Sequence, residues 1–404
     1  MSRASAAKAQ PIHRGKFVTW LAEVFQLNPA GLIWPRAMMF LDIALVPLVV
    51  FWAIGHEEYL LSALFGALFV WLADPGGRYG PRVARMAIYA AIGAGLTALA
   101  FGIGGDAWGW LMLAASAVTL VASLAVMFGI RRFATCMLLN IWFILALAVA
   151  FGFHHSPHHF TQYTWAQTLA WTGGAALWIA VSFVAWLISG RQDQPQPIAE
   201  LPGDTSRQKL TPPIVMFAVL RTIVIAGTSA IAFGANPSHG VWLVFSAMIA
   251  MKPSLEQSTV FAMQRLSGAV IGAVAAILLL LIPASVHGLH LAAVTLGLQA
   301  VALVIFAHAA AIRFWNYAVY YSCLSAGILT LMDVLQPTDY SAEGYRVLWV
   351  VCGVAIGVLV MLLAGLLAKR GAKAPPQAAG GQGADVPAQR TTTADQPRPA
   401  PSGS

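Results

Sequence analysis

The stretch "MIAMKPSLEQST", residues 248–259, places a lysine, a proline, a glutamate and four further polar side chains between two strongly apolar runs. The apolar run before it, residues 239–251, contains thirteen residues. At 1.5 Å per residue, a helix of that length spans about 20 Å, whereas the hydrocarbon core of a bilayer is about 30 Å thick. If this run crosses a membrane, Lys252 and Pro253 therefore lie within membrane depth.

The composition requires a membrane. The chain has 404 residues, of which 59% are hydrophobic and only 9% charged, and its mean hydropathy is +0.74. Soluble domains carry about 25% charged residues. The net charge is +8, but the basic residues fall between apolar runs as topology signals do, and no basic stretch with interleaved aromatic residues indicates a nucleic-acid partner.

Twelve apolar runs, most of them near the ~20 residues that cross a bilayer, predict about twelve transmembrane helices in an all-α polytopic membrane protein. The runs cover residues 37–55, 60–73, 86–104, 109–129, 133–152, 166–189, 213–234, 239–251, 266–283, 288–310, 315–335 and 345–368.

The loops between these runs alternate in charge. Lys and Arg occur in every second loop, whereas the other loops, such as "GHEEY" and "FHHSPHHFTQYT", contain neither. The positive-inside rule then places both termini in the cytoplasm. The first residues carry neither an early apolar run nor a small-residue cleavage site, so we expect no signal peptide.

Five segments follow from this pattern. We expect a cytoplasmic N-terminus with an interfacial amphipathic helix (1–30), a first six-helix unit (31–189), a Pro- and Gln-rich cytoplasmic linker (190–212), a second six-helix unit (213–370) and a disordered cytoplasmic tail (371–404).

The two six-helix units resemble each other. "WLADPGGRYGPRVARMAIYAAIGAG" (71–95) aligns with "MIAMKPSLEQSTVFAMQRLSGAVIGA" (248–273), so that Pro75 corresponds to Pro253 and Arg85 to Arg265. Because six helices return the chain to its starting side, both units begin inside and the repeat is parallel. Its pseudo-two-fold axis should run along the membrane normal.

The two shortest runs, 60–73 and 239–251, occupy matching positions in the two units, and interrupted helices at such positions indicate a transport site. Ser254 and Gln257 have the spacing of a capping box that begins a new helix after Pro253. The free N–H groups of that helix end, together with Lys252, would attract an anion. The alternative is an ordinary cytoplasmic turn that obeys the positive-inside rule.

The segment "GVWLVFSAMIAMKPSLEQSTVFAMQRLSGAVIGAVAA" (240–276) resembles the fusaric acid resistance protein-like family of inner-membrane transporters, and "RFWNYAVYYSCLSAGILTLMDVL" (313–335) resembles a later helix of that family. The resemblance extends over most of residues 30–370. It implies efflux of aromatic acids or drugs across the bacterial inner membrane and kinship with plant malate channels. Many efflux members have a large domain between their halves, whereas the linker here has about twenty residues.

Charged residues within membrane spans are functional candidates by default. Asp42 and Arg221 occupy nearly equivalent repeat positions with opposite sign, and the hypothesis is that they face each other or the substrate path; snorkelling toward the interface is the alternative. The predicted substrate-binding residues are Lys252, Ser254, Glu256, Arg265, Arg221, Trp242, Arg85 and Arg313, and the predicted proton-coupling residues are Asp42 and Asp74. Asn140 and Asn316 are expected to bond neighbouring helices.

Enzymatic chemistry finds little support. His155, His158 and His159 have an H-x-x-H-H spacing that can hold iron or zinc, but no second histidine box accompanies them. A phosphate-binding G-x-x-x-x-G-K-[ST] loop is also absent. We therefore expect no enzyme activity, no cofactor and no metal.

These patterns predict an inner-membrane exporter of small organic anions such as aromatic carboxylates, with coupling to the proton gradient implied by the family resemblance. Two alternatives stay open, a passive malate-channel-like anion channel and an envelope protein without transport activity. The expected partners are the organic anion and the lipid bilayer. A homo-oligomer and a periplasmic adaptor are further partners that the sequence leaves open.

Overall fold

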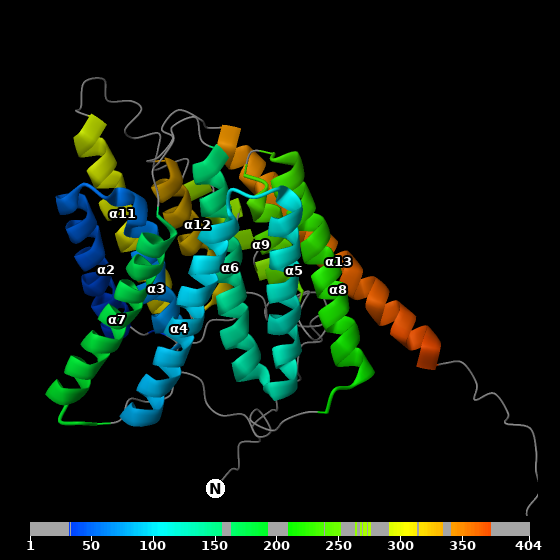
Figure 1. Ribbon diagram of the computed structural model, residues 1–404, viewed down its shortest axis with the longest axis horizontal. Coiled ribbons are helices and arrows are strands. Elements are labelled where there is room, and N and C mark those ends of the chain that lie inside the picture. The colour runs from blue at the N-terminus through cyan, green and yellow to red at the C-terminus, as the bar shows by residue number, and fades with distance from the viewer. Residues whose placement is uncertain are drawn as a thin grey trace, which may run out of the picture.

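The fold is a bundle of α-helices (Figure 1). The computed structural model describes residues 32, 34–155, 163–192, 209–237, 239–251, 263–264, 267–268, 270–272, 274–275, 291–312, 315–333 and 341–372. Its elements are α2 Trp34–Ile54, η2 Glu57–Tyr59, α3 Leu60–Ala73, α4 Tyr79–Ile103, α5 Trp108–Leu124, η3 Ala125–Phe128, α6 Ile130–His155, α7 Thr164–Ile188, α8 Pro212–Ser229, η4 Ala230–Ala235, α9 Val241–Ala250, α11 Leu291–Ile312, α12 Tyr317–Asp333 and α13 Ser341–Ala372.

The predicted all-α class is confirmed, because these residues contain no β-strand. Six of the described helices are long and apolar enough to cross a membrane, and α3 and α9 are among the shorter apolar helices. A helix satisfies all its backbone hydrogen bonds internally, which hydrocarbon surroundings require. The predicted total of about twelve spans and the two repeats are not established by this set.

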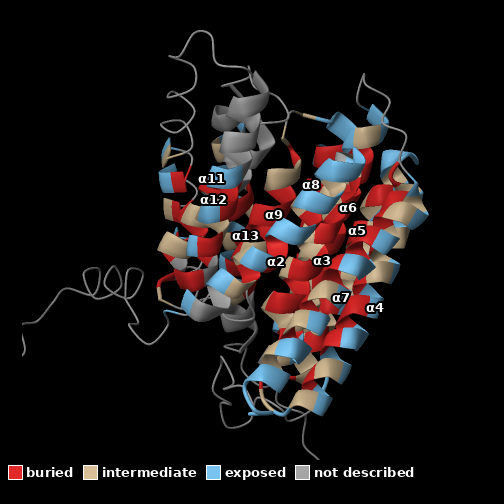
Figure 2. Cartoon of the chain, turned by 90° about the vertical axis from the view of Figure 1, so that its left-hand side faces the viewer, coloured by how far each residue is buried: buried red, intermediate tan, exposed pale blue. Residues whose placement is uncertain are grey.

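Burial follows the pattern of a protein in lipid. Large apolar side chains such as Ile88, Val121, Ile188 and Ile223 are exposed on the outside of the bundle, and buried residues follow the faces where helices meet (Figure 2). In water these exposed side chains would form a large apolar surface that monomeric soluble proteins avoid. The chain is therefore a membrane protein.

Two stacked indoles lie in the apolar core of residues 34–188. The ring centroids of Trp142 and Trp171 are 4.4 Å apart, with 24° between the ring planes. Their N–H groups donate to Thr97 Oγ1 at 2.8 Å and to the Ala90 carbonyl at 3.2 Å. These bonds satisfy polar groups that would otherwise be unpaired in an apolar interior, and they link α6 and α7 to α4.

Each short helix packs most extensively against one long helix, α3 against α7 and α9 against α13. A Cβ atom on Gly174 of α7 would overlap the Ala63 carbonyl of α3, and one on Gly353 of α13 would overlap the Leu243 carbonyl of α9. Only glycine permits this backbone approach. In addition, α5 packs against α8 and α2 packs against α11. Helices that precede residue 190 therefore contact helices that follow residue 209.

Candidate functional site

A buried ion pair spans the non-helical segment between α3 and α4. Asp74 caps the end of α3 with extended backbone (φ −60°, ψ 113°). Arg82, in the first turn of α4, donates from Nε to Asp74 Oδ1 at 2.7 Å and from Nη2 to Oδ2 at 2.5 Å, and the Gly76 N–H donates to Oδ1 at 3.0 Å. The two charged side chains are at most 1% exposed. The break therefore lies in the protein interior, and its carboxylate is fully engaged.

The structure corrects the predicted start of this helix. The apolar run suggested residue 86, whereas α4 begins at Tyr79. Gly80 and Pro81 look like helix breakers in the sequence, but proline fits the first turn of a helix, where its missing N–H has no intrahelical partner. Arg82 and Arg85 are therefore helical; Arg82 is buried and Arg85 is exposed.

The second short helix also ends in extended backbone, at Met251 (φ −81°, ψ 108°). The next residues, which include the predicted ligands Lys252, Ser254 and Glu256, lie outside the described part of the chain, as do Arg265 and Arg313. The structure does describe the residues that pack beside this end of α9, and Arg221 is one of them.

Arg221 is a wholly buried cation in α8, with 0% exposure. Its Nη2 donates to the Met248 carbonyl in α9 at 3.3 Å, and its guanidinium carbon lies 5.5 Å from the Phe133 ring centroid and 5.9 Å from that of Phe217. Its Nε and Nη1 atoms have no hydrogen-bond partner among the described residues. Two nitrogen atoms of a charged guanidinium, which together carry three N–H groups, thus have no acceptor within the described part of the bundle.

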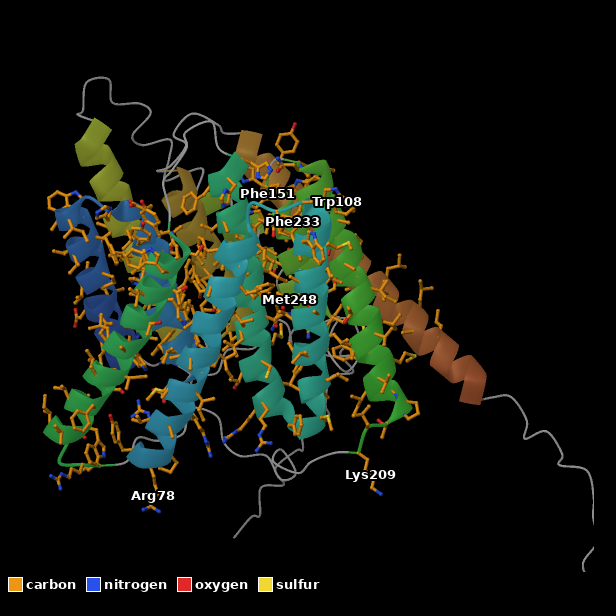
Figure 3. The ribbon with its side chains drawn as sticks, in the orientation of Figure 1. Arg78, Trp108, Phe151, Lys209, Phe233 and Met248 are labelled. Carbon is orange, nitrogen blue, oxygen red and sulfur yellow. The ribbon has the colours of Figure 1, made fainter. Side chains whose placement is uncertain are left out.

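A chain of polar contacts positions this arginine. Met248, labelled near the centre of the bundle in Figure 3, accepts a hydrogen bond at its sulfur from Asn140 Nδ2 at 3.2 Å. The same amide nitrogen lies 3.1 Å from Thr119 Oγ1. Asn140 on α6 therefore bonds α5 and α9, as predicted for it, and the Met248 carbonyl continues the chain to Arg221. The bond that the structure gives for Asn316 caps its own helix, from the Val319 N–H at 3.0 Å.

The other predicted residues lie apart from this cluster. Asp42 is exposed on α2, and α2 and α8 occupy opposite sides of the bundle (Figure 1), so Asp42 and Arg221 do not face each other. Trp242 is partly buried, with its ring 5.7 Å from that of Phe245. Arg78 and Lys209 lie at the same end of the bundle, on opposite sides of it (Figure 3), as expected for loops on the same side of a membrane.

Sequence reasoning missed the partners of these charges. In the sequence, Arg82 lies before the apolar run 86–104, and nothing distinguishes Phe133, Phe217 and Met248 from the apolar residues around them. Phe217 lies four residues before Arg221, which is the spacing of neighbours on one helix face. That spacing is the only signal in the sequence that could have connected them.

An apolar groove of about 630 Å³ runs between α2 and α7, with Pro47, Phe51, Tyr59, Gly173 and Leu177 among its lining residues. None of the predicted site residues lines it. Of the histidine cluster, His155 donates from Nδ1 to the Phe151 carbonyl, 2.9 Å away, while His158 and His159 lie outside the described residues.

The model of one protein family, described as fusaric acid resistance protein-like, matches residues 224–360, about a third of the chain. The match begins within α8 and ends within α13, and it confirms the resemblance predicted from the sequence. No curated protein and no solved structure matches the chain.

Proposed function

We propose that this membrane protein of the fusaric acid resistance protein-like family transports small organic anions, and that Arg221 holds the anionic group. The observation that carries the proposal is a wholly buried guanidinium beside the end of α9 whose Nε and Nη1 have no hydrogen-bond partner in the part of the chain that the structure describes. Intramembrane charges are expected to lie on substrate or ion pathways. A carboxylate would supply the missing acceptors for Nε and Nη1.

The energetics favour a role in binding over a role in stability. Moving an isolated charge out of water costs several kcal/mol in a real protein. One hydrogen bond to a carbonyl and two ring contacts recover only part of this, at about 1.5–3 kcal/mol for a charged hydrogen bond and roughly 0.5–2 kcal/mol for each cation–π contact. A ligand carboxylate could recover the remainder through a bidentate pair with the guanidinium.

The surroundings of Arg221 favour an anion with an apolar body. Phe133 and Phe217 flank the guanidinium, and Met137 and Met251 belong to the same buried cluster. Rings and thioethers contact aromatic or aliphatic groups well. This supports aromatic or other hydrophobic carboxylates as substrates, which agrees with the efflux function that the family resemblance implies.

The architecture proposed for this transporter is two parallel six-helix repeats, about twelve helices in all. Two matching contacts support it, that of Gly174 in α7 with α3 and that of Gly353 in α13 with α9. The packing of α2 against α11 likewise matches that of α8 against α5. A pseudo-two-fold axis along the membrane normal would relate such pairs. Both termini would then lie on the side of Arg78 and Lys209, the cytoplasmic side of a bacterial inner membrane.

Coupling to the proton gradient, if present, is better assigned to Asp42 than to Asp74. Asp74 can accept a proton only when its bonds to Arg82 and Gly76 break. Asp42 is exposed on α2 and forms no such pair in the described part of the chain. The passive-channel alternative needs neither residue.

The first test is flux into inverted membrane vesicles, measured with labelled benzoate and malate, with and without an imposed proton gradient. We expect gradient-dependent uptake by the wild type and a loss of roughly tenfold or more in Arg221→Gln, since a hydrogen bond to a charged group contributes about 1.5–3 kcal/mol. Arg191→Gln is the matched control, because Arg191 is exposed and its guanidinium carbon lies 5.9 Å from the Trp186 ring centroid.

The outcomes separate the functions. Uptake that follows membrane voltage and ignores the proton gradient would identify a channel. Uptake by Arg221→Gln at the wild-type rate would refute the role of Arg221, and the absence of uptake by folded wild-type protein would refute the transport proposal for these acids.

A second prediction places a competing carboxylate beside Arg221. Glutamate at position 217, four residues before Arg221 on the same helix, has the spacing of an intrahelical ion pair. Phe217→Glu is therefore expected to occupy the guanidinium and reduce uptake at least tenfold, whereas Phe217→Gln, which removes the same ring contact without adding a charge, should reduce uptake less. The same vesicle assay checks this, and equal uptake by the two variants would contradict it.

A further inference from the structure

Three N–H donors converge on one carboxylate at the break after α3. Arg82 contributes Nε and Nη2, and Gly76 contributes its backbone N–H. The guanidinium is held by α4, whereas the carboxylate of Asp74 comes from the extended residue that ends α3. This is the fork geometry with which arginine binds planar carboxylates in general, including those of ligands.

We propose that Arg82 and Gly76 form a second carboxylate-binding site, which the chain's own Asp74 occupies at rest. The two buried arginines then represent two states of the same kind of site. Arg82 is filled by a tethered carboxylate, whereas Nε and Nη1 of Arg221 have no acceptor among the described residues. This inference concerns Arg82 and does not rest on the proposed transport function.

The sequence supports the contrast between the two halves. In the alignment of the repeats, Asp74 corresponds to Lys252 and Asp42 to Arg221. The first half therefore carries carboxylates at two positions where the second half carries cations. In the first half Asp74 neutralises Arg82, whereas Nε and Nη1 of Arg221 have no acceptor among the described residues.

The burial of the site limits the ligand to a small monocarboxylate. The side chains of Asp74 and Arg82 are 0% and 1% exposed, so the space available to a replacement is that of the Asp74 side chain itself. Asp74→Ala would remove the carboxylate and leave a space close to the size of formate. Larger acids such as benzoate do not fit there without movement of α3 or α4.

The test is thermal unfolding of the purified full-length protein. Every protein compared also carries Arg221→Gln, so that binding at Arg221 does not contribute. Asp74→Ala is expected to lower the unfolding temperature by on the order of 5 °C or more, because it leaves a buried charge unpaired. Sodium formate should restore a saturable part of this loss. Sodium chloride at equal ionic strength and sodium benzoate should not restore it.

The specific control is Arg82→Gln combined with Asp74→Ala, which removes the charged donor and should abolish the response to formate. A folded Asp74→Ala chain with no formate-specific gain, or an equal gain in the double variant, would overturn the proposal. If Asp74→Ala aggregates in chloride, purification in formate decides the question. Folded protein recovered only in formate supports the site, and aggregation in both salts overturns it.

Discussion

Replacing Arg221 by methionine is expected to give a protein that is more stable than the wild type and that no longer transports its anion. The arginine is wholly buried, and its Nε and Nη1 have no partner among the described residues. Methionine fills similar volume beside Met137 and Met251 without a charge. Exchange of buried ionic groups for apolar residues of similar size has stabilised proteins by about 1–4 kcal/mol, and we expect a gain in the lower part of that range.

The opposite result is expected for the other buried arginine, which makes it the matched control. Arg82→Met would leave the Asp74 carboxylate buried without its ion-pair partner, which costs about 3–5 kcal/mol. Chemical or thermal unfolding in detergent, together with vesicle uptake, measures both variants. If Arg221→Met destabilised the protein as strongly as Arg82→Met, Arg221 would be a structural residue and the binding role would lose its basis.

The second large effect is expected at the crossing of α3 and α7. Gly174→Ala places a methyl group in the Ala63 backbone carbonyl, and backbone atoms cannot move aside as a flexible side chain does. The two helices must separate, and we expect a loss of about 3 kcal/mol or more, the upper range for overpacking. Protein yield and unfolding temperature in detergent are the readouts.

The adjacent residue provides the control for this variant. A Cβ on Gly173 meets nothing within 4 Å, so Gly173→Ala should be neutral or slightly stabilising, since alanine favours a helix by about 1 kcal/mol over glycine. If the proposed repeat is correct, Gly353→Ala should behave like Gly174→Ala. Equal effects of Gly173→Ala and Gly174→Ala would refute the close approach.

The membrane class, the all-α fold and the short run at 60–73 could be predicted from apolar periodicity, because hydrocarbon surroundings leave few alternatives to an apolar helix. Arg221 could be singled out because charges inside apolar runs are rare, and Asp74 because it follows a run too short to cross a bilayer. Their partners could not be, since the contacts of Arg221 with Phe133 and Met248 come from helices far apart in the sequence.

The one predicted pairing that the structure overturns has an instructive cause. Asp42 and Arg221 are predicted to face each other or the substrate path because they occupy nearly equivalent positions in the two repeats, and the structure overturns only the first of these alternatives. Equivalent positions about a two-fold axis meet only when they lie close to that axis, and α2 and α8 lie on opposite sides of the bundle (Figure 1). The residues around Lys252, which prompted the search for a site, lie outside the described chain and stay predictions.

The glycine crossings also bear on how such a bundle could move. Because α9 meets α13 backbone to backbone at Gly353, these two helices cannot slide past each other without a clash, and they must travel as one body. The contact between α8 and α9 at Arg221 is of a different kind, a single hydrogen bond of 3.3 Å among thioethers and rings that slip easily. The contact between α8 and α9 beside Arg221 should therefore resist relative motion less than the crossing of α9 and α13 does.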